Sequence, residues 1–216
     1  MKSITPIRSA AMALSLTLIA TGPAAAEMVE KSFDFTDFDK VVFKGVFDVE
    51  IEVGGDAYSI DLSGRDEEMA RVEVSVEEGA LVFDQSRKKS GGDRKGVDVM
   101  IAMPALNGID ISGVAELDAT GIQSDAFAAK LSGVGDVSLA GTCGTLDARV
   151  SGVGELEAED LICADVTVKV SGVGEAEVHA SESVDAEVSG MGEISVYGSP
   201  KDVRQKSGLF GSVKVK

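Results

Sequence analysis

Two cysteines and a periodic row of carboxylates are the residues of this 216-residue chain whose types and spacing could do chemistry. Cys143 and Cys163 are the only cysteines, and each lies eight residues before a serine, Ser151 or Ser171. Equivalent positions in adjacent coils of a repeat hold Cα atoms within the about 4.4–6.8 Å that a disulfide requires. The spacing therefore favours a Cys143–Cys163 disulfide, with two reduced cysteines in a thin core as the alternative.

The carboxylates recur with nearly the same period as the cysteines. They are Glu116, Asp136, Glu155, Glu175 and Glu193. Stacked in adjacent coils, such groups repel by about 1 kcal/mol per neighbour even in water. A divalent cation such as Ca²⁺, which takes oxygen ligands, would offset this repulsion. Internal pairing with a basic ladder of Lys130, Arg149 and Lys169, or plain solvation, is the preferred interpretation.

Catalytic constellations are hard to build from this sequence. His179 is the only histidine, so a nucleophilic triad lacks a placed base and a metal pair with the cysteines is least expected. Paired carboxylates that cleave polysaccharides need a walled groove. The repeat varies in length by only two residues, which leaves no long loops to form such walls. We therefore expect neither an enzyme nor a cofactor.

The elements that would position these residues are set by a short internal repeat. Its corners read serine, glycine, an apolar residue, a small residue and an acid, at spacings of 20, 19, 20 and 18 residues. The corner pairs are Ser112-Gly113, Ser132-Gly133, Ser151-Gly152, Ser171-Gly172 and Ser189-Gly190. Between corners the apolar residues alternate with period two, which indicates strands. A unit this short cannot bury its own apolar face and must stack on its neighbours.

The predicted fold is all-β, a right-handed parallel β-helix with coils of about 18–20 residues and no helical domain. Stacking would place equivalent residues in ladders. One ladder follows the corner glycines and consists of Val114, Val134, Val153, Val173 and Met191. Another precedes the corner serines and consists of Ile111, Leu131, Val150, Val170 and Val188.

The chain divides into a leader, one domain and a basic end. Residues 1–26 have the basic start, apolar run and small-residue cleavage site of a signal peptide. A single β-helix domain follows over 27–200, irregular to about 105 and regular over 106–198. Five phenylalanines within 33–47 are interpreted as an N-terminal cap, 86–96 as a solvated basic loop, and 201–216 as a basic cap or tail.

The net charge and the apolar segments of the chain limit its possible partners and its location. The chain carries a net charge of −17, and loss of the leader removes two of 20 basic residues and none of 37 acidic ones, giving −19. Such a charge repels nucleic acid phosphates. A second apolar span is lacking, so no transmembrane segment is expected in the mature chain. Export to the periplasm is favoured, with the cell surface or secretion as alternatives.

The Ser-Gly corners at about 20-residue spacing, preceded by a strand and Pro104-Ala105-Leu106, resemble the GIN domain family (DUF2807), an auto-transporter adhesin head domain. The resemblance covers roughly residues 33–200. It implies a β-helix, an exported and often surface-associated protein, and no established enzymatic activity. It does not extend to a membrane barrel, because nothing after residue 200 could build one.

The sequence thus predicts an exported, non-enzymatic protein with an adhesin-like binding or scaffolding role in the cell envelope. Its partner would be a protein or glycan of the envelope, and self-association into a homo-oligomer stays open. The alternative is a carbohydrate-active β-helix enzyme, a polysaccharide lyase or hydrolase.

Overall fold

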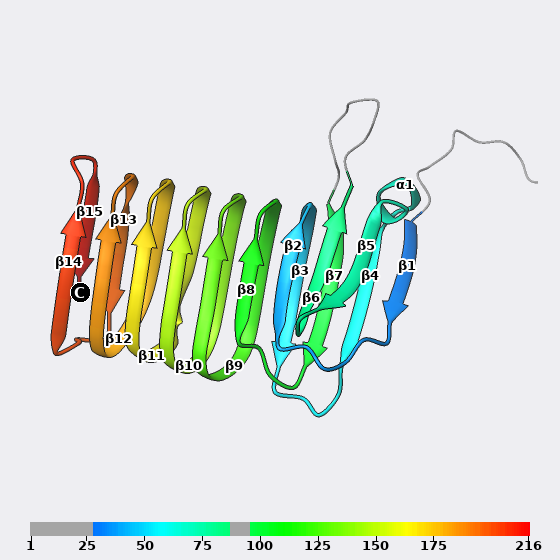
Figure 1. Ribbon diagram of the computed structural model, residues 1–216, viewed down its shortest axis with the longest axis horizontal. Coiled ribbons are helices and arrows are strands. Elements are labelled where there is room, and N and C mark those ends of the chain that lie inside the picture. The colour runs from blue at the N-terminus through cyan, green and yellow to red at the C-terminus, as the bar shows by residue number, and fades with distance from the viewer. Residues whose placement is uncertain (1–27, 87–95) are drawn as a thin grey trace, which may run out of the picture.

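The computed structural model describes residues 28–86 and 96–216. The predicted signal peptide and the predicted basic loop, except for its end residues Ser86 and Gly96, lie outside these described residues. The described chain is almost entirely strand, and its coils stack into a right-handed solenoid with two flat sheets (Figure 1). The predicted all-β parallel β-helix is confirmed.

Each regular coil is one long strand that serves both sheets. The four strands are β9 (Val114–Leu131), β10 (Val134–Val150), β11 (Val153–Val170) and β12 (Val173–Val188). Each descends through the rear sheet of Figure 1, bends at the lower edge and ascends through the front sheet to the next Ser-Gly corner. Neighbouring coils pair in parallel, so both predicted ladders are present in register.

The remaining strands extend the two sheets. The rear sheet also contains β1 (Met28–Phe33), β4 (Ser59–Arg65), β7 (Val97–Met103), β3 (Val46–Val53), β13 (Met191–Tyr197) and β15 (Gly211–Val215). The front sheet also contains β5 (Val72–Glu77), β6 (Ala80–Gln85), β2 (Lys40–Lys44), β8 (Gly108–Ile111) and β14 (Asp202–Ser207). A single helical turn, α1 (Asp66–Met69), lies between β4 and β5.

The core is a thin layer of aliphatic side chains between the two sheets. The ladder that precedes the corners, from Ile111 to Val188, is fully buried. So are the inward positions of the rear sheet, such as Leu117 and Leu156. Because side chains alternate between the two faces of a strand, every second residue of each coil faces solvent. These outward positions carry the charges of the molecule.

The N-terminal end departs from simple coils. Strand β1 pairs with β4, β4 with β7 and β5 with β6, all in antiparallel fashion. Phe43 and Phe47 are buried in the core with Phe83, and the Phe43 and Phe83 ring centroids are 4.8 Å apart. The interpretation of the phenylalanine cluster as a cap is therefore wrong for these rings. The strands β1 and β5 end the two sheets instead.

Residues 201–216 form a further coil rather than a tail. Strand β14 pairs in parallel with β12, and β15 pairs in parallel with β13. The lysines of this coil contact carboxylates of the preceding one. The pairs are Lys201–Glu182 at 2.6 Å, Lys206–Glu187 at 2.7 Å, Lys214–Glu193 at 2.7 Å and Lys216–Glu177 at 3.7 Å. Backbone pairing and these four ion pairs thus join the basic end to the acidic solenoid.

Acidic pH should loosen this last coil. Hydrogen bonds from lysine hold the pKa of Glu187 and of Glu193 below the usual value of 4.5. A lowered folded pKa contributes stability that is present above the unfolded pKa and lost as the pH falls through the folded one. Hydrogen-exchange protection of β14 and β15, relative to β10, should therefore drop between about pH 6 and about pH 3. Unchanged relative protection would contradict the pairing.

Candidate binding surface

A continuous row of carboxylates runs along the outer face of the rear sheet, beside the corners. Parallel register stacks the five predicted acids, Glu116, Asp136, Glu155, Glu175 and Glu193, directly on one another. The row continues into the irregular half through Asp48 of β3 and Asp98 of β7. We call these seven residues the acidic row. Asp48 and Asp98 were missed, although the clean alternation in β3 puts Asp48 on the outer face.

A second set of acids lies two residues further along the same strands and the same face. Glu50, Asp118, Glu157 and Glu177 occupy this set, with Ser138 between Asp118 and Glu157. The Ser138 hydroxyl donates a hydrogen bond of 2.9 Å to Glu157. Together with the acidic row, these residues make the outer face of the rear sheet, the rear face below, strongly negative.

The cations of the repeat lie on the opposite sheet. Lys130, Arg149 and Lys169 stack in register as a ladder on the front sheet. They pair there with Asp110 at 2.8 Å, Asp147 at 2.7 Å and Glu187 at 3.6 Å, respectively. The predicted pairing of this ladder with the acidic row is therefore wrong. The corner between them reverses the chain and sends the two ladders to different sheets.

Across the described residues, the rear face receives its ion pairs only at its C-terminal end. Lys214 pairs with Glu193 of the acidic row, and Lys216 pairs with Glu177 of the second set. From Asp98 to Glu175, the other six carboxylates of the acidic row have no ion pair with a described lysine or arginine. Several charges of the front sheet are thus paired with one another, whereas most of the acidic row has no described cationic partner.

Repulsion within the acidic row affects the pKa of Glu155, which lies near the centre of the row. Partial burial is the largest cause that raises the pKa of Glu155 above its usual value of 4.5. The negative charges of its neighbours in the acidic row and in the second set raise this pKa further. Both causes disfavour the ionised form of Glu155. Repulsion within the acidic row therefore destabilises the fold, and other interactions must compensate for it.

Replacing Glu155 with glutamine should stabilise the fold at neutral pH. A raised folded pKa costs stability above the folded value, and the cost disappears as the pH falls to the unfolded value near 4.5. We expect a gain on the order of 0.5 kcal/mol at about pH 7 and none at about pH 4. Urea unfolding at both pH values measures this. Glu187→Gln, which removes a paired charge, is the control and should destabilise the fold. Destabilisation by Glu155→Gln at pH 7 would contradict repulsion within the acidic row.

The acidic row does not converge on a metal site. Among the described residues, no group of three histidine, cysteine, aspartate or glutamate side chains is arranged to hold a metal ion. Carboxylates in a parallel ladder point outward side by side, whereas Ca²⁺ takes six to eight oxygen ligands from around the ion. The calcium hypothesis for the row therefore gains no support from its geometry.

The two cysteines lie opposite each other in adjacent coils. Cys143 of β10 is in register with Cys163 of β11, the Cα atoms are 4.5 Å apart, and the sulfur atoms are at disulfide distance. The bond joins two successive coils at the lower edge of the solenoid, where each long strand bends. Cys163 is buried and Cys143 half-buried. The pair therefore fastens the edge that lies opposite the corners.

The corners stack backbone on backbone. The hydroxyls of Ser112 and Ser132 lie within hydrogen-bond reach of the carbonyls of Phe43 and Ile111 in the preceding coil, at 3.4 and 3.1 Å. A Cβ atom added to Gly152 would overlap the backbone of Gly133, and the other corner glycines of the repeat are crowded in the same way. The predicted corner residues thus hold the coils together.

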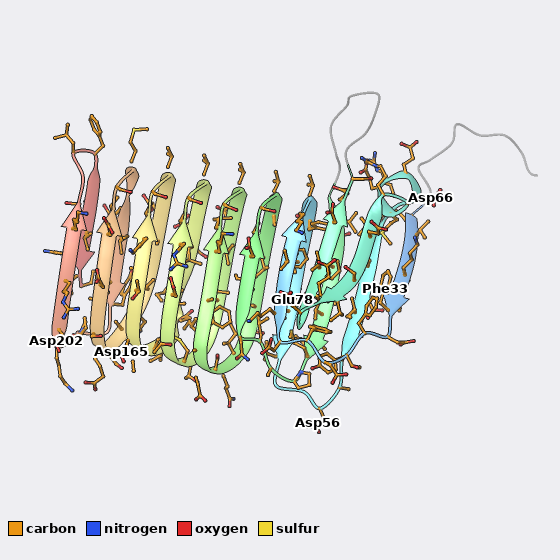
Figure 2. The ribbon with its side chains drawn as sticks, in the orientation of Figure 1. Phe33, Asp56, Asp66, Glu78, Asp165 and Asp202 are labelled. Atoms are coloured by element: carbon orange, nitrogen blue, oxygen red, sulfur yellow. A yellow bond between two sulfur atoms is a disulfide. The ribbon has the colours of Figure 1, made fainter. Side chains whose placement is uncertain are left out.

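The front sheet carries an open hollow of about 550 Å³ at its lower part. It is lined by residues of β10, β11, β12 and β14, among them the outward-facing Asp147, Asp165, Asp185 and Asp202. Figure 2 shows Asp165 and Asp202 at the lower edge of the solenoid. Asp147 accepts a hydrogen bond from Arg149 and Asp165 one from Ser183, so two of the four carboxylates are already engaged.

Stacked coils with repeated Ser-Gly corners define this protein as a β-solenoid. The chain belongs to the GIN domain family: the family model described as "Putative auto-transporter adhesin, head GIN domain" matches residues 37–200. The resemblance inferred from the corners is confirmed. No curated protein is similar enough in sequence to match the chain. None of the described helices is long and apolar enough to cross a membrane.

Two solved structures share the fold. A protein of Bacteroides fragilis, described as a "putative adhesin", superposes with a TM-score of 0.74 and is 24% identical, covering 89% of this chain and 98% of its own. A protein of Parabacteroides merdae with the same description has a TM-score of 0.50 and 18% identity, covering 88% and 96%. At these identities the likeness concerns the fold alone.

Proposed function

We propose that this chain is an exported, non-enzymatic binding module of the cell envelope, and that its rear face binds a positively charged partner. The observation that carries the proposal is the acidic row, in which six stacked carboxylates have no described cationic partner. Uncompensated charge on a rigid, flat sheet attracts an oppositely charged surface and speeds its association. The signal-peptide pattern of residues 1–26 supports export, and the family's adhesin-head description supports a binding role.

The proposed partner is a protein or glycan of the envelope with exposed positive charge. Nucleic acids are disfavoured because their phosphates share the sign of the face. The register spaces the carboxylates of the row by about 4.8 Å, so the surface matches a dense array of cations better than a single ion. The structure supports a broad docking face rather than a pocket for a small ligand.

Titration with an oligolysine peptide tests this function. The wild-type chain should bind it with an affinity that falls steeply with added salt. The variant Asp136→Asn/Glu155→Gln/Glu175→Gln should bind about tenfold more weakly, whereas Asp165→Asn/Asp185→Asn/Asp202→Asn, which removes three charges from the front sheet, should change affinity less than about twofold. Equal losses for the two triple variants would reduce the effect to net charge and would refute a dedicated face.

The front hollow favours a second candidate, a carbohydrate-active enzyme, because four aspartates line it. Incubation of the mature chain with acidic and neutral polysaccharides separates the two functions. Chain cleavage that is lost in the Asp165→Asn/Asp185→Asn/Asp202→Asn variant would support the enzyme and count against the binding module.

A further inference from the structure

Apolar side chains form an exposed ridge along the corner edge. The ridge consists of Val114, Val134, Val153, Val173 and Met191, which are 44–55% exposed, and of Phe210, which is 73% exposed. Parallel register stacks the first five. Phe210 precedes Gly211, which pairs with Gly192, and so occupies the position of Met191 in the last coil. A row of side chains projects from this edge in Figure 2.

The core does not require this ridge. The residues after it on the rear strands, such as Ala115 and Leu117, face inward and are buried. The ridge shares the outward parity of the acidic row, where polar residues are otherwise the rule. Strand propensity accounts for valine at the start of a strand, but it does not account for a flexible methionine at Met191. Six successive coils therefore expose apolar area that the fold leaves unused.

In the regular coils, a carboxylate lies beside each ridge residue at the same distance along the strand. In each regular coil, the residue two positions after the ridge residue is the carboxylate of the acidic row, on the same strand and face. Two residues of an extended strand span about 7 Å, and adjacent coils are about 4.8 Å apart. The edge thus presents two parallel lines, one apolar and one negative, that run along the solenoid axis.

This arrangement disfavours two occupants. A second copy carries the same net charge of −17, so ridge-to-ridge pairing would bring two strongly negative chains together, and like charges oppose association. An anionic lipid surface would be repelled by the carboxylates of the acidic row.

We propose that the ridge and the acidic row together bind an amphipathic, positively charged polypeptide helix that lies along the solenoid axis. Its apolar stripe would pack on the ridge, and its lysines or arginines would face the acidic row. The 5.4 Å pitch of an α-helix is close to the coil spacing, and the ridge, about 24 Å long, matches about 16 helical residues. This inference rests on the proposed function and specifies the chemical class of the partner.

Two peptides of about 18 residues, made only of leucine and lysine, probe the ridge. In one, the leucines recur at i, i+3, i+4 and i+7 to form a stripe; in the other, the same composition is scrambled. Calorimetric titration of the full mature chain should show about tenfold tighter binding of the striped peptide.

Threonine at three ridge positions should abolish this preference. Val134→Thr/Val153→Thr/Val173→Thr keeps the β-branched shape of the side chains and makes them polar. We expect the striped peptide to bind about tenfold more weakly and the scrambled one to be unaffected. Ala126→Thr/Ala128→Thr, on exposed positions of the front sheet, is the control and should leave both affinities unchanged.

The outcomes separate this inference from the function on which it rests. Equal affinities for the two peptides, or no effect of the ridge variant, would overturn the helix partner while oligolysine binding still upheld the acidic face. Absence of binding by every cationic peptide would overturn both. A dimer, or sedimentation with neutral lipid vesicles, that disappears in the ridge variant would assign the ridge to another occupant and overturn the inference.

Discussion

Replacing Gly152 with alanine should strongly destabilise the solenoid. The added Cβ would overlap the carbonyl of Gly133 in the coil before it, and this contact is backbone, which cannot rotate away. The strands around the corner would have to separate or shift register. Overpacking normally costs about 1–3 kcal/mol, and a fixed backbone obstacle places this change at about 3 kcal/mol or above.

Urea unfolding measures the effect, with Gly55→Ala as the matched control. Gly55 lies in the turn after β3, and a Cβ there would meet no atom within 4 Å. We expect the Gly55 variant to stay within about 0.5 kcal/mol of the wild type. If Gly152→Ala unfolded at the wild-type urea concentration, the close backbone stacking of the corners would be refuted.

Removal of the cysteine pair should cost about 3 kcal/mol. The bond closes a loop of 20 residues between adjacent coils, and a loop of this size loses about that much unfolded-state entropy when it is cross-linked. The double variant Cys143→Ala/Cys163→Ala avoids leaving a free thiol. Its urea midpoint should match that of the wild type in reductant, and reductant should not change it further.

Thiol labelling gives an independent check on the same pair. The unfolded, unreduced wild type should resist alkylation, and reduction should expose two reactive thiols. Labelling of both cysteines without reductant, together with a midpoint that is insensitive to reductant, would mean that the pair is packed but not bonded.

The regular half of the fold could be predicted because the repeat fixes position and parity at once. Five Ser-Gly corners define where each coil turns, and alternation then assigns every residue to the inner or outer face. The acidic ladder, the two apolar ladders and the juxtaposed cysteines follow from this register without further information. The same alternation also indicates that Val134 is exposed. Counting back from the buried Val137, Asp136 faces outward, Gly135 faces inward and Val134 faces outward.

The irregular half could not be predicted in the same detail. Alternation indicates a strand but carries no information about its direction, so the antiparallel pairing of β1, β4 and β5 was not visible. Phe33 lies in β1, where a sheet ends, whereas Phe43 and Phe47 lie in the interior strands β2 and β3 and have the correct parity for the core. Without a repeat to fix register, nothing in the sequence distinguished a core aromatic from a capping one.

The expected pairing of the basic ladder with the acidic row failed for a geometric reason. Lys169 and Glu175 are six residues apart, and in an unbroken strand they would share a face. The corner at Ser171 turns the chain from the front sheet to the rear sheet (Figure 1). The outward positions of Lys169 and Glu175 therefore belong to opposite faces of the solenoid. This separation leaves most of the acidic row without a described cationic partner.

The most direct test of the rear face as the binding surface is photo-crosslinking in cells that make the protein. A crosslinking amino acid at Ser138 reports on the rear face, and one at Thr167, which is similarly half-buried, reports on the front sheet. We predict an adduct from Ser138 with a basic polypeptide and none from Thr167. An adduct from Thr167 alone, or equal adducts from both positions, would contradict the assignment of binding to the acidic rear face.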